Sequence, residues 1–410
     1  MDLLLTYSSQ LATRNSQLSI TGSKSETNRL LLLQALYTNL ILENTSNSDD
    51  SEVMQKALQN SPLIDVHHAG TAMRFLTAYF SIQEGKEVVL TGSSRMKERP
   101  IQILVDALNQ LGAEITYEEK KGFPPIRIKG KKITQNKVSL SANVSSQYIS
   151  ALLLIAPKLE KGLELTLEGE ITSIPYIKMT LALLNEIGIE TSFVGNKIVV
   201  CHAELVSASQ LTVESDWSSA SYWYSIVALS KIGTQITLSS YKENSLQGDS
   251  ALVTIYQDFG VETTFNTDNS ITISKINNCQ LSIVNYQLNN CPDIAQTIAV
   301  TCFGLGIGCE LTGLHTLKIK ETDRLEALKM ELTKLGADIS VTNDALYLKS
   351  SVTIKENVSI ATYQDHRMAM AFAPLALKVP ILINEVEVVS KSYPDFWEDL
   401  KKAGCSIEEI

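Results

Sequence analysis

LTKLGADIS, at residues 332–340, is one copy of a sequence pattern that recurs along the chain and predicts the fold. In every copy a helix-like run ends at a Gly and passes directly into a β-rich segment. Gly suits the left-handed residue that ends a helix, and the Ile, Val and Thr that follow favour a strand. The other copies are LNQLGAEIT at 108–116, LNEIGIETS at 184–192, YQDFGVETT at 256–264 and LKKAGCSIE at 400–408.

The copies return about every 70 residues, which is too long a period for a solenoid. Five copies, with room for a degenerate sixth before Ala69, predict six α/β units. We expect these units to be grouped three and three into two lobes with a cleft between them. Chance recurrence of a common helix-Gly-strand junction is the alternative.

Composition predicts a compact globular protein. The 410 residues exceed what one core normally organises, and 44% of them are apolar.

The start MDLLLTYSSQ has no basic leader and too short an apolar run for a secretory signal, so we expect a cytoplasmic protein without a membrane segment. The six cysteines lack CxxC spacing or nearby His partners, which favours buried reduced thiols over a metal or redox site.

Ten Lys and Arg residues lie in short motifs that contain Gly, Ser or Thr, although the chain as a whole has a formal net charge of −10. Local cation clusters on an acidic chain indicate a small polyanionic ligand, because nucleic acid usually requires a broadly basic face. Several motifs also open apolar helical runs, where free backbone N–H groups attract anions. The cations are Lys24, Arg29, Arg74, Arg95, Lys97, Arg99, Lys320, Arg324, Arg367 and Lys391.

Two helix starts can be placed by their caps. Ser23 and Glu26 have the spacing of a capping box, and a second helix is expected to begin at Ser145 and Ser146. Nucleotide-binding signatures are not matched: TGSKSETNR at 21–29 lacks the phosphate-loop spacing, and GLGIG at 304–308 is not a dinucleotide fingerprint. We therefore expect no nucleotide cofactor.

Nine strings, taken together and in order, resemble the enolpyruvylshikimate phosphate (EPSP) synthase family. The resemblance implies transfer of the enolpyruvyl group of phosphoenolpyruvate to the 5-hydroxyl of shikimate 3-phosphate, without metal or redox cofactor. The strings are GSKSETNR at 22–29, AGTAMR at 69–74, RMKERP at 95–100, VSSQ at 144–147, SDWSSASY at 215–222, PDIAQT at 292–297, KETDR at 320–324, DHRMAM at 365–370 and KSYPDF at 391–396.

The resemblance also implies the architecture. It is an α/β fold of two lobes, an inside-out α/β barrel, in which each lobe has three βαβαββ units with pseudo-threefold symmetry. The first lobe would comprise residues 1–20 and 216–410, and the second residues 21–215. The two crossings, near 20–23 and 213–217, would form a hinge. A monomer is expected, with no nucleic acid or membrane partner.

Site residues follow from the same resemblance, position by position. The implied catalytic residues are Asp293, Glu321, Lys24 and Lys391. The implied phosphoenolpyruvate ligands are Lys24, Gly70, Arg95, Gln147, Arg324, Arg367 and Lys391. The implied shikimate 3-phosphate ligands are Lys24, Ser25, Arg29, Ser145, Ser146, Gln147, Ser173, Tyr176, Asp293 and Lys320.

The group that protonates the methylene carbon of phosphoenolpyruvate stays open at this stage. Carboxylates among cations should have depressed pKa values, which suits Asp293 as a base but makes Glu321 harder to protonate. Lys391 could donate the proton instead. The chain also departs from the family pattern: His68 and Phe75 flank AGTAMR, and we expect His68 to be a neutral hydrogen-bonding residue. Gly70 is kept, so the family's inhibitor glyphosate should fit.

Two other classes compete with this interpretation. The sister enolpyruvyl transferase that acts on a UDP-sugar commonly has a loop Cys in its first-encoded lobe, whereas no Cys precedes Cys201 here. A catalytically dead anion-binding protein would keep the Arg clusters but lose its acid and base groups. Asp293, Glu321 and Lys391 are all present, which argues against that class.

Overall fold

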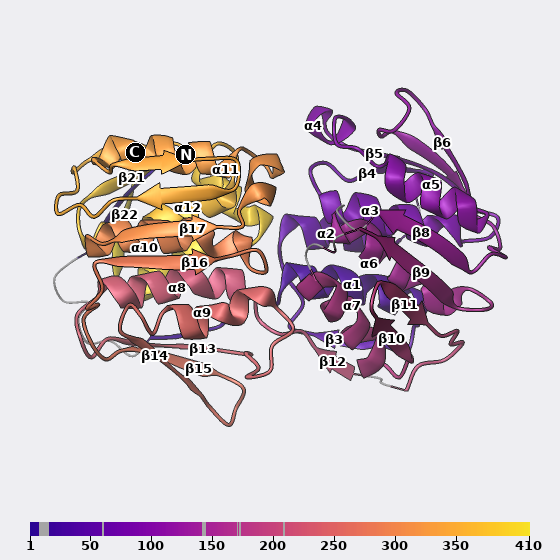
Figure 1. Ribbon diagram of the computed structural model, residues 1–410, viewed down its shortest axis with the longest axis horizontal. Helices are drawn as coiled ribbons and strands as arrows, with labels where there is room; N and C mark the ends of the chain where they lie inside the picture. The colour runs from indigo at the N-terminus through magenta and orange to yellow at the C-terminus, as the bar shows by residue number, and fades with distance from the viewer. Residues whose placement is uncertain (8–15, 60, 142–144, 170, 172–173, 208–209) are drawn as a thin grey trace. The chain divides into compact units, whose positions relative to one another are not determined.

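The computed structural model divides into two compact units that the chain enters and leaves through two crossings (Figure 1). It describes residues 1–7, 16–59, 61–141, 145–169, 171, 174–207 and 210–410. Unit 1 comprises Met1–Thr21 and Glu214–Ile410, and unit 2 comprises Gly22–Val213. We describe each unit by itself.

Unit 1 contains three four-stranded sheets of identical strand pattern. Two strands pair in parallel, and the remaining two add antiparallel. The first sheet has the order β16(Ile283–Gln287), β17(Gly308–Thr312), β19(Ala345–Leu348), β18(Ile339–Val341). The second is β2(Ser16–Leu18), β13(Gln235–Leu238), β15(Ile271–Lys275), β14(Val261–Phe265), and the third is β20(Val358–Ile360), β21(Ile381–Ile383), β1(Leu3–Tyr7), β22(Cys405–Glu409).

Unit 2 repeats this pattern twice and part of it once. Its complete sheets are β4(Leu63–Asp65), β5(Glu87–Thr91), β7(Ile126–Lys129), β6(Glu114–Tyr117), and β8(Lys137–Ser141), β9(Leu163–Glu168), β11(Lys197–Val200), β10(Thr191–Val194). The third sheet has only the parallel pair β3(Ile41–Glu43) and β12(Gln210–Thr212) among the described residues. In the described part of the chain, the six expected units are therefore five complete ones and one with a parallel pair alone.

One helix of each repeat is buried almost completely. These inner helices are α8(Trp217–Leu229), α10(Ala295–Leu305) and α12(His366–Phe372) in unit 1, and α1(Lys24–Leu36), α3(Gly70–Ser81) and α6(Ser146–Ile155) in unit 2. They pack against one another within each unit, as α8 and α10 do in Figure 1. A helix that is apolar on every side needs such an environment. In α8 and α12 the only residues that are not buried are Ser218 and Arg367, each in the first turn.

The second helix of each repeat is half-buried or short. These outer helices are α2(Asp49–Ala57), α5(Gln102–Leu111), α7(Ile174–Glu186), α9(Leu252–Ile255), α11(Arg324–Leu335) and α13(Phe396–Lys402). The short α4(Ser94–Lys97) precedes α5. Short 3₁₀ segments complete the described part of the chain: η2(Ala156–Lys158), η3(Gly248–Ala251), η4(Pro292–Ile294), η5(His315–Ile319), η6(Ala373–Leu377) and η7(Val386–Lys391).

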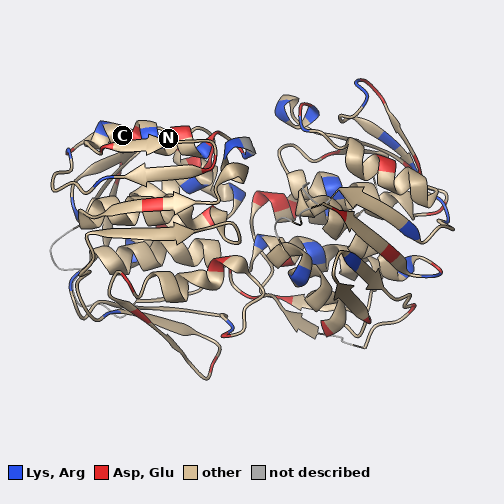
Figure 2. Cartoon of the chain, viewed as in Figure 1, with Lys and Arg blue, Asp and Glu red and all other residues tan. Residues whose placement is uncertain are grey.

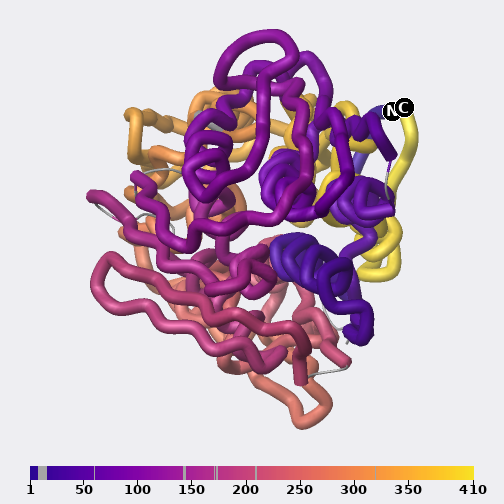
Figure 3. The backbone as a smooth tube through the Cα atoms, turned by 90° about the vertical axis from the view of Figure 1, so that its right-hand side faces the viewer, coloured from indigo at the N-terminus to yellow at the C-terminus, as the bar shows by residue number. Residues whose placement is uncertain are grey.

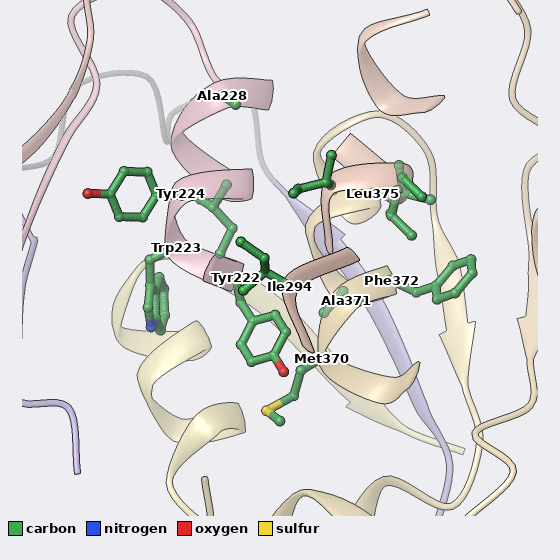
Figure 4. Packing of buried hydrophobic residues seen from close by; sticks show 14 of the residues in the cluster. Tyr222, Trp223, Tyr224, Ala228, Ile294, Met370, Ala371, Phe372 and Leu375 are labelled. Carbon is green, nitrogen blue, oxygen red and sulfur yellow. The ribbon is translucent and has the colours of Figure 1, made fainter. Parts of the chain in front are cut away.

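Figure 4 shows part of the core of unit 1, where α8 packs against α10 and η6, and α10 packs against α12. Tyr222, Trp223 and Tyr224 project from α8, and Met370 and Phe372 from α12, all at most 1% exposed. Edge-to-face ring contacts stabilise the core beyond the burial of apolar area. The ring centres of Tyr222 and Phe396, for example, lie 5.7 Å apart. This packing holds the first turns of the inner helices in place.

The recurring Gly residues stand at the same point of each repeat, between the outer helix and the third strand. Gly112, Gly188, Gly260, Gly336 and Gly404 have φ values of 106°, 90°, 76°, 105° and 95°. A side chain is strained in that left-handed region, so the Gly-based prediction of helix ends is confirmed.

The two ends of the chain meet in one sheet. β1 pairs antiparallel with β22, with Leu5 opposite Ile407, and the N- and C-termini lie side by side (Figure 3). The first strand of the chain thus completes the last repeat of unit 1.

Two details differ from expectation. Ser23 is the N-cap of α1, but within the described chain its side chain makes no capping hydrogen bond. The expected capping box is therefore wrong. Of the six cysteines, which are all free thiols, four are buried as expected, whereas Cys201 is exposed and Cys279 is half-buried. Among the described residues, no helix has the length and apolar character needed to cross a bilayer.

Candidate functional site

In unit 1 the first turns of several helices bring together cations and carboxylates. Arg324, the first residue of α11, is 2% exposed and contacts three carboxylates. Its Nε donates to Asp365 Oδ2 at 2.6 Å, its Nη1 to Asp293 Oδ1 at 2.9 Å and its Nη2 to Glu321 Oε2 at 2.8 Å. Helix starts that lie far apart in sequence therefore converge on one guanidinium.

Arg367 is the second cation of this cluster. Its backbone N–H donates to Asp365 Oδ1 at 2.9 Å, so Asp365 caps α12 while it also holds Arg324. The Arg367 Nη2 atom lies 3.3 Å from Asp293 Oδ2 and donates to Ser218 Oγ at 3.2 Å. Its Nε is buried and has no hydrogen-bond partner within the described residues.

Asp293 in η4 is the carboxylate that these cations share. Besides Arg324 and Arg367, the Lys320 Nζ atom lies 3.4 Å from Asp293 Oδ1. Burial by itself would raise the pKa of Asp293, but the charges of Arg367, Lys320 and Arg324 together hold that pKa well below its usual range. The expected depression is confirmed, and Asp293 is ionised at neutral pH.

Lys391 lies at the end of η7, which packs against α12. Its Nζ donates to the backbone carbonyl of Gln364 at 2.7 Å, one residue before Asp365. Gln364 and Tyr363 have φ values of 57° and 54°. This turn, unusual for residues with side chains, places the ammonium of Lys391 beside the start of α12.

In unit 2 the first turns of α1, α3 and α6 carry the corresponding residues. Gln147 Nε2 donates to Thr71 Oγ1 at 3.0 Å, which links α6 to α3. Lys24 Nζ in α1 pairs with Asp50 Oδ2 at 3.3 Å. The Arg99 guanidinium lies over Gly70, because a Cβ on that glycine would come within 2.5 Å of Arg99 Nη1.

Arg29 supports this region from inside unit 2. It is 3% exposed, and its three nitrogen atoms donate to Thr180 Oγ1, the Ser25 carbonyl and Ser150 Oγ at 2.7–3.0 Å. Its guanidinium also lies 5.5 Å from the ring centre of the buried Phe75. Burial lowers the pKa of Arg29 to about 10, which still leaves it positively charged at neutral pH.

The other expected residues are placed less closely. Arg95 lies on α4, 63% of its side chain is exposed, and it pairs with Glu98 at 2.9 Å. Ser145 caps α6 by accepting a hydrogen bond from the Gln147 N–H, Ser146 is the first residue of that helix, and Tyr176 lies in the first turn of α7. Ser173 lies outside the described residues. His68 Nδ1 is 2.9 Å from Ser93 Oγ, the hydrogen-bonding role expected for it.

Sequence reasoning missed Ser218 and Asp249 in unit 1. Ser218 stands in the quoted string SDWSSASY, and Asp249 follows Gly248 in η3, where nothing in the sequence marked it. Its place in the first turn after the capping Asp216, within the polar string SDWSSASY, is the sequence signal that could have found Ser218.

Charges of both signs are interspersed over each unit (Figure 2). Arg324 and Arg367 stand at helix starts, where free backbone N–H groups suit small anions. The fold and these clusters have the features expected of a class of protein that binds small polyanions at helix N-termini.

Comparisons with known proteins identify the family. The family described as EPSP synthase (3-phosphoshikimate 1-carboxyvinyltransferase) matches residues 59–400. A 3-phosphoshikimate 1-carboxyvinyltransferase of Bacteroides fragilis is 45% identical over 413 residues, covering 100% of this chain and 99% of the relative. One from Colwellia psychrerythraea is 34% identical over 422 residues, covering 95% of this chain and 97% of the relative. The chain belongs to the EPSP synthase family.

The solved structures support the fold. EPSP synthase from Acinetobacter baumannii matches with a TM-score of 0.80 at 20% identity, and all of both chains is covered. The expected fold class, α/β with two lobes of repeated units, is confirmed.

Proposed function

We infer that this protein transfers the enolpyruvyl group of phosphoenolpyruvate to the 5-hydroxyl of shikimate 3-phosphate and releases phosphate. Membership of the family, at 45% identity over the full chain, carries this conclusion. The reaction needs a base for the hydroxyl proton. The ionised carboxylate of Asp293, which lies among Arg324, Arg367 and Lys320, can serve as that base.

The reaction forms a bond between the substrate hydroxyl oxygen and C2 of phosphoenolpyruvate, and C3 gains a proton. Loss of a proton from C3 and cleavage of the bond between C2 and the phosphate oxygen then release phosphate. Asp293 is the proposed base for the hydroxyl proton, and a well-placed base accelerates such a step by about 10²–10⁴-fold. Neither substrate is oxidised or reduced in this addition and elimination, so the reaction requires no redox cofactor.

In unit 1, Arg324, Arg367 and Lys391 are proposed ligands of phosphoenolpyruvate, with the two guanidinium groups on its carboxylate. In unit 2, Lys24, Gly70, Arg95 and Gln147 complete its site, with Lys24 and Arg95 on the phosphate. The proposed ligands of shikimate 3-phosphate are Lys24, Ser25, Arg29, Ser145, Ser146, Gln147, Ser173, Tyr176, Asp293 and Lys320.

We further propose that the units close on these substrates about the two crossings between them, and that the protein works as a cytoplasmic monomer. Two groups are candidates for protonating C3. Glu321 is 37% exposed and bound to Arg324, whereas Lys391 stands at the start of α12. Both are part of the proposed catalytic set with Asp293 and Lys24.

A phosphate-release assay tests this function. Phosphate should appear only when phosphoenolpyruvate and shikimate 3-phosphate are both present, and not with a UDP-sugar as the acceptor. Release with the UDP-sugar would favour the sister transferase. Binding of both substrates without any release would instead favour an inactive anion-binding protein.

A further inference from the structure

A hydrogen-bonded path leads from Arg367 to a second buried carboxylate. Ser218 Oγ, in the first turn of α8, accepts from Arg367 Nη2 at 3.2 Å and donates to Asp249 Oδ2. Asp249 lies in η3 and is 6% exposed. The serine hydroxyl thus uses its single donor on Asp249 and accepts from Arg367 on its other side.

Asp249 has no cation of its own among the described residues, since no Lys or Arg nitrogen there lies within 4.0 Å of its carboxylate. The groups that face it are Asp216 at the cap of α8, Asp293 in η4, Cys291 just before η4 and Arg367 in α12. Burial and, next, the negative charge of Asp293 raise the pKa of Asp249 to about 7. The pKa of the Cys291 thiol is raised by burial to about 12, so it stays neutral.

We propose that Ser218 and Asp249 form a positioning arm that orients the Arg367 guanidinium, and that the charge on Asp249 sets how strongly Arg367 holds an anionic substrate. The inference rests on the proposed function for the identity of that anion. The unpaired Nε of Arg367 is the donor that the arm leaves free for the ligand.

The sign of the effect follows from the charges. When Asp249 is neutral, Arg367 is balanced mainly by Asp293, with a smaller contribution from Asp216, and attracts a carboxylate well. When the pH rises and Asp249 ionises, a second negative charge competes for the same guanidinium and weakens the anion site. Phosphoenolpyruvate should therefore bind less tightly above neutral pH, in addition to any effect of its own ionisation.

The test compares wild type with Asp249→Asn, measuring kcat and KM for phosphoenolpyruvate between pH 6 and pH 8.5 by phosphate release. An Asn oxygen still accepts from Ser218 but cannot ionise. At pH 8.5 the variant should have a KM about fivefold lower than wild type, while at pH 6 the two should agree. Asp338→Asn, an exposed residue of the same unit, is the matched control and should follow wild type at every pH.

Ser218→Ala removes the arm itself. It should raise the KM for phosphoenolpyruvate about three- to tenfold and leave kcat within about twofold. The proposal is overturned if wild type and Asp249→Asn show parallel pH profiles, or if Ser218→Ala leaves KM unchanged. Absence of phosphate release by the wild-type protein would instead count against the proposed function, so the two failures are distinct.

Discussion

Charge balance in the unit 1 cluster determines how an anion can enter. Arg324, Arg367 and Lys320 face Asp293, Glu321 and Asp365, so three positive charges meet three negative ones. Asp365 is fully buried and 11% of the Asp293 side chain is exposed, whereas 37% of the Glu321 side chain is exposed. Glu321 is thus the carboxylate that can release Arg324 to a substrate at least cost.

Replacing Glu321 by Ala tests its catalytic role. We expect kcat to fall about 10²–10⁴-fold, because a proton-transfer group is lost, while shikimate 3-phosphate still binds normally. Stopped-time phosphate assays and binding calorimetry measure the two quantities. Glu326→Ala, an exposed position on the same helix, is the control. Near-normal turnover would remove Glu321 from the catalytic set and leave Lys391 as the proton donor.

Gly70→Ala probes the space beneath Arg99. The new methyl group would lie 2.5 Å from Arg99 Nη1, so this flexible side chain must move while the backbone of α3 stays in place. We expect an unchanged melting temperature but a KM for phosphoenolpyruvate raised about tenfold. Glyphosate inhibition should weaken in the same variant, whereas wild type should be inhibited in the millimolar range or below. A variant with wild-type KM would show that Gly70 does not border the substrate.

The sequence allowed most charged residues of the site to be named, but not the contacts between them. Asp293 could be expected to have a low pKa because its motif and the Arg motifs were both visible. Ser218 and Asp249 were missed because their hydrogen bond spans 31 residues and depends on how η3 packs against α8. The inward turn of Phe75 beneath Arg29 was likewise a matter of packing.

Among the elements, the helix-Gly-strand junctions could be predicted best because their cause is local. A left-handed residue ends the helix whatever surrounds it. Within the described residues, the sixth sheet has no antiparallel pair and Ser23 makes no capping hydrogen bond. Neither could be predicted in this way, since both depend on tertiary packing.

Two glycines of unit 1 allow this local account to be tested. At Gly336 a Cβ has only ordinary contacts, so Gly336→Ala should cost about 1–2 kcal/mol from left-handed strain alone. At Gly260 a Cβ would also collide with the backbone carbonyl of Asn277, so Gly260→Ala should cost more. Thermal unfolding should show a drop of about 2–4 °C per kcal/mol. Equal losses at the two positions would contradict the role given to the Asn277 carbonyl.

At the scale of the whole molecule, the repeat count and the family strings together indicated two bodies of three repeats each. Three inner helices recur in each unit, with three four-stranded sheets in unit 1 and two four-stranded sheets and one parallel pair in the described part of unit 2, and two chain crossings connect the units. The charged cluster of unit 1 and the helix starts of unit 2 lie on separate bodies, so the proposed reaction requires both to contribute to one substrate site.

The affinity for phosphoenolpyruvate at saturating shikimate 3-phosphate tests that requirement most directly. Calorimetry on Arg95→Ala in unit 2 and Arg367→Lys in unit 1 should show phosphoenolpyruvate bound at least about tenfold more weakly by each variant. Arg95→Ala removes a proposed phosphate ligand. In Arg367→Lys, the Lys cannot bind a carboxylate through two parallel hydrogen bonds. Shikimate 3-phosphate should still bind both variants. If either variant kept wild-type affinity for phosphoenolpyruvate, a single site shared by the two units would be contradicted.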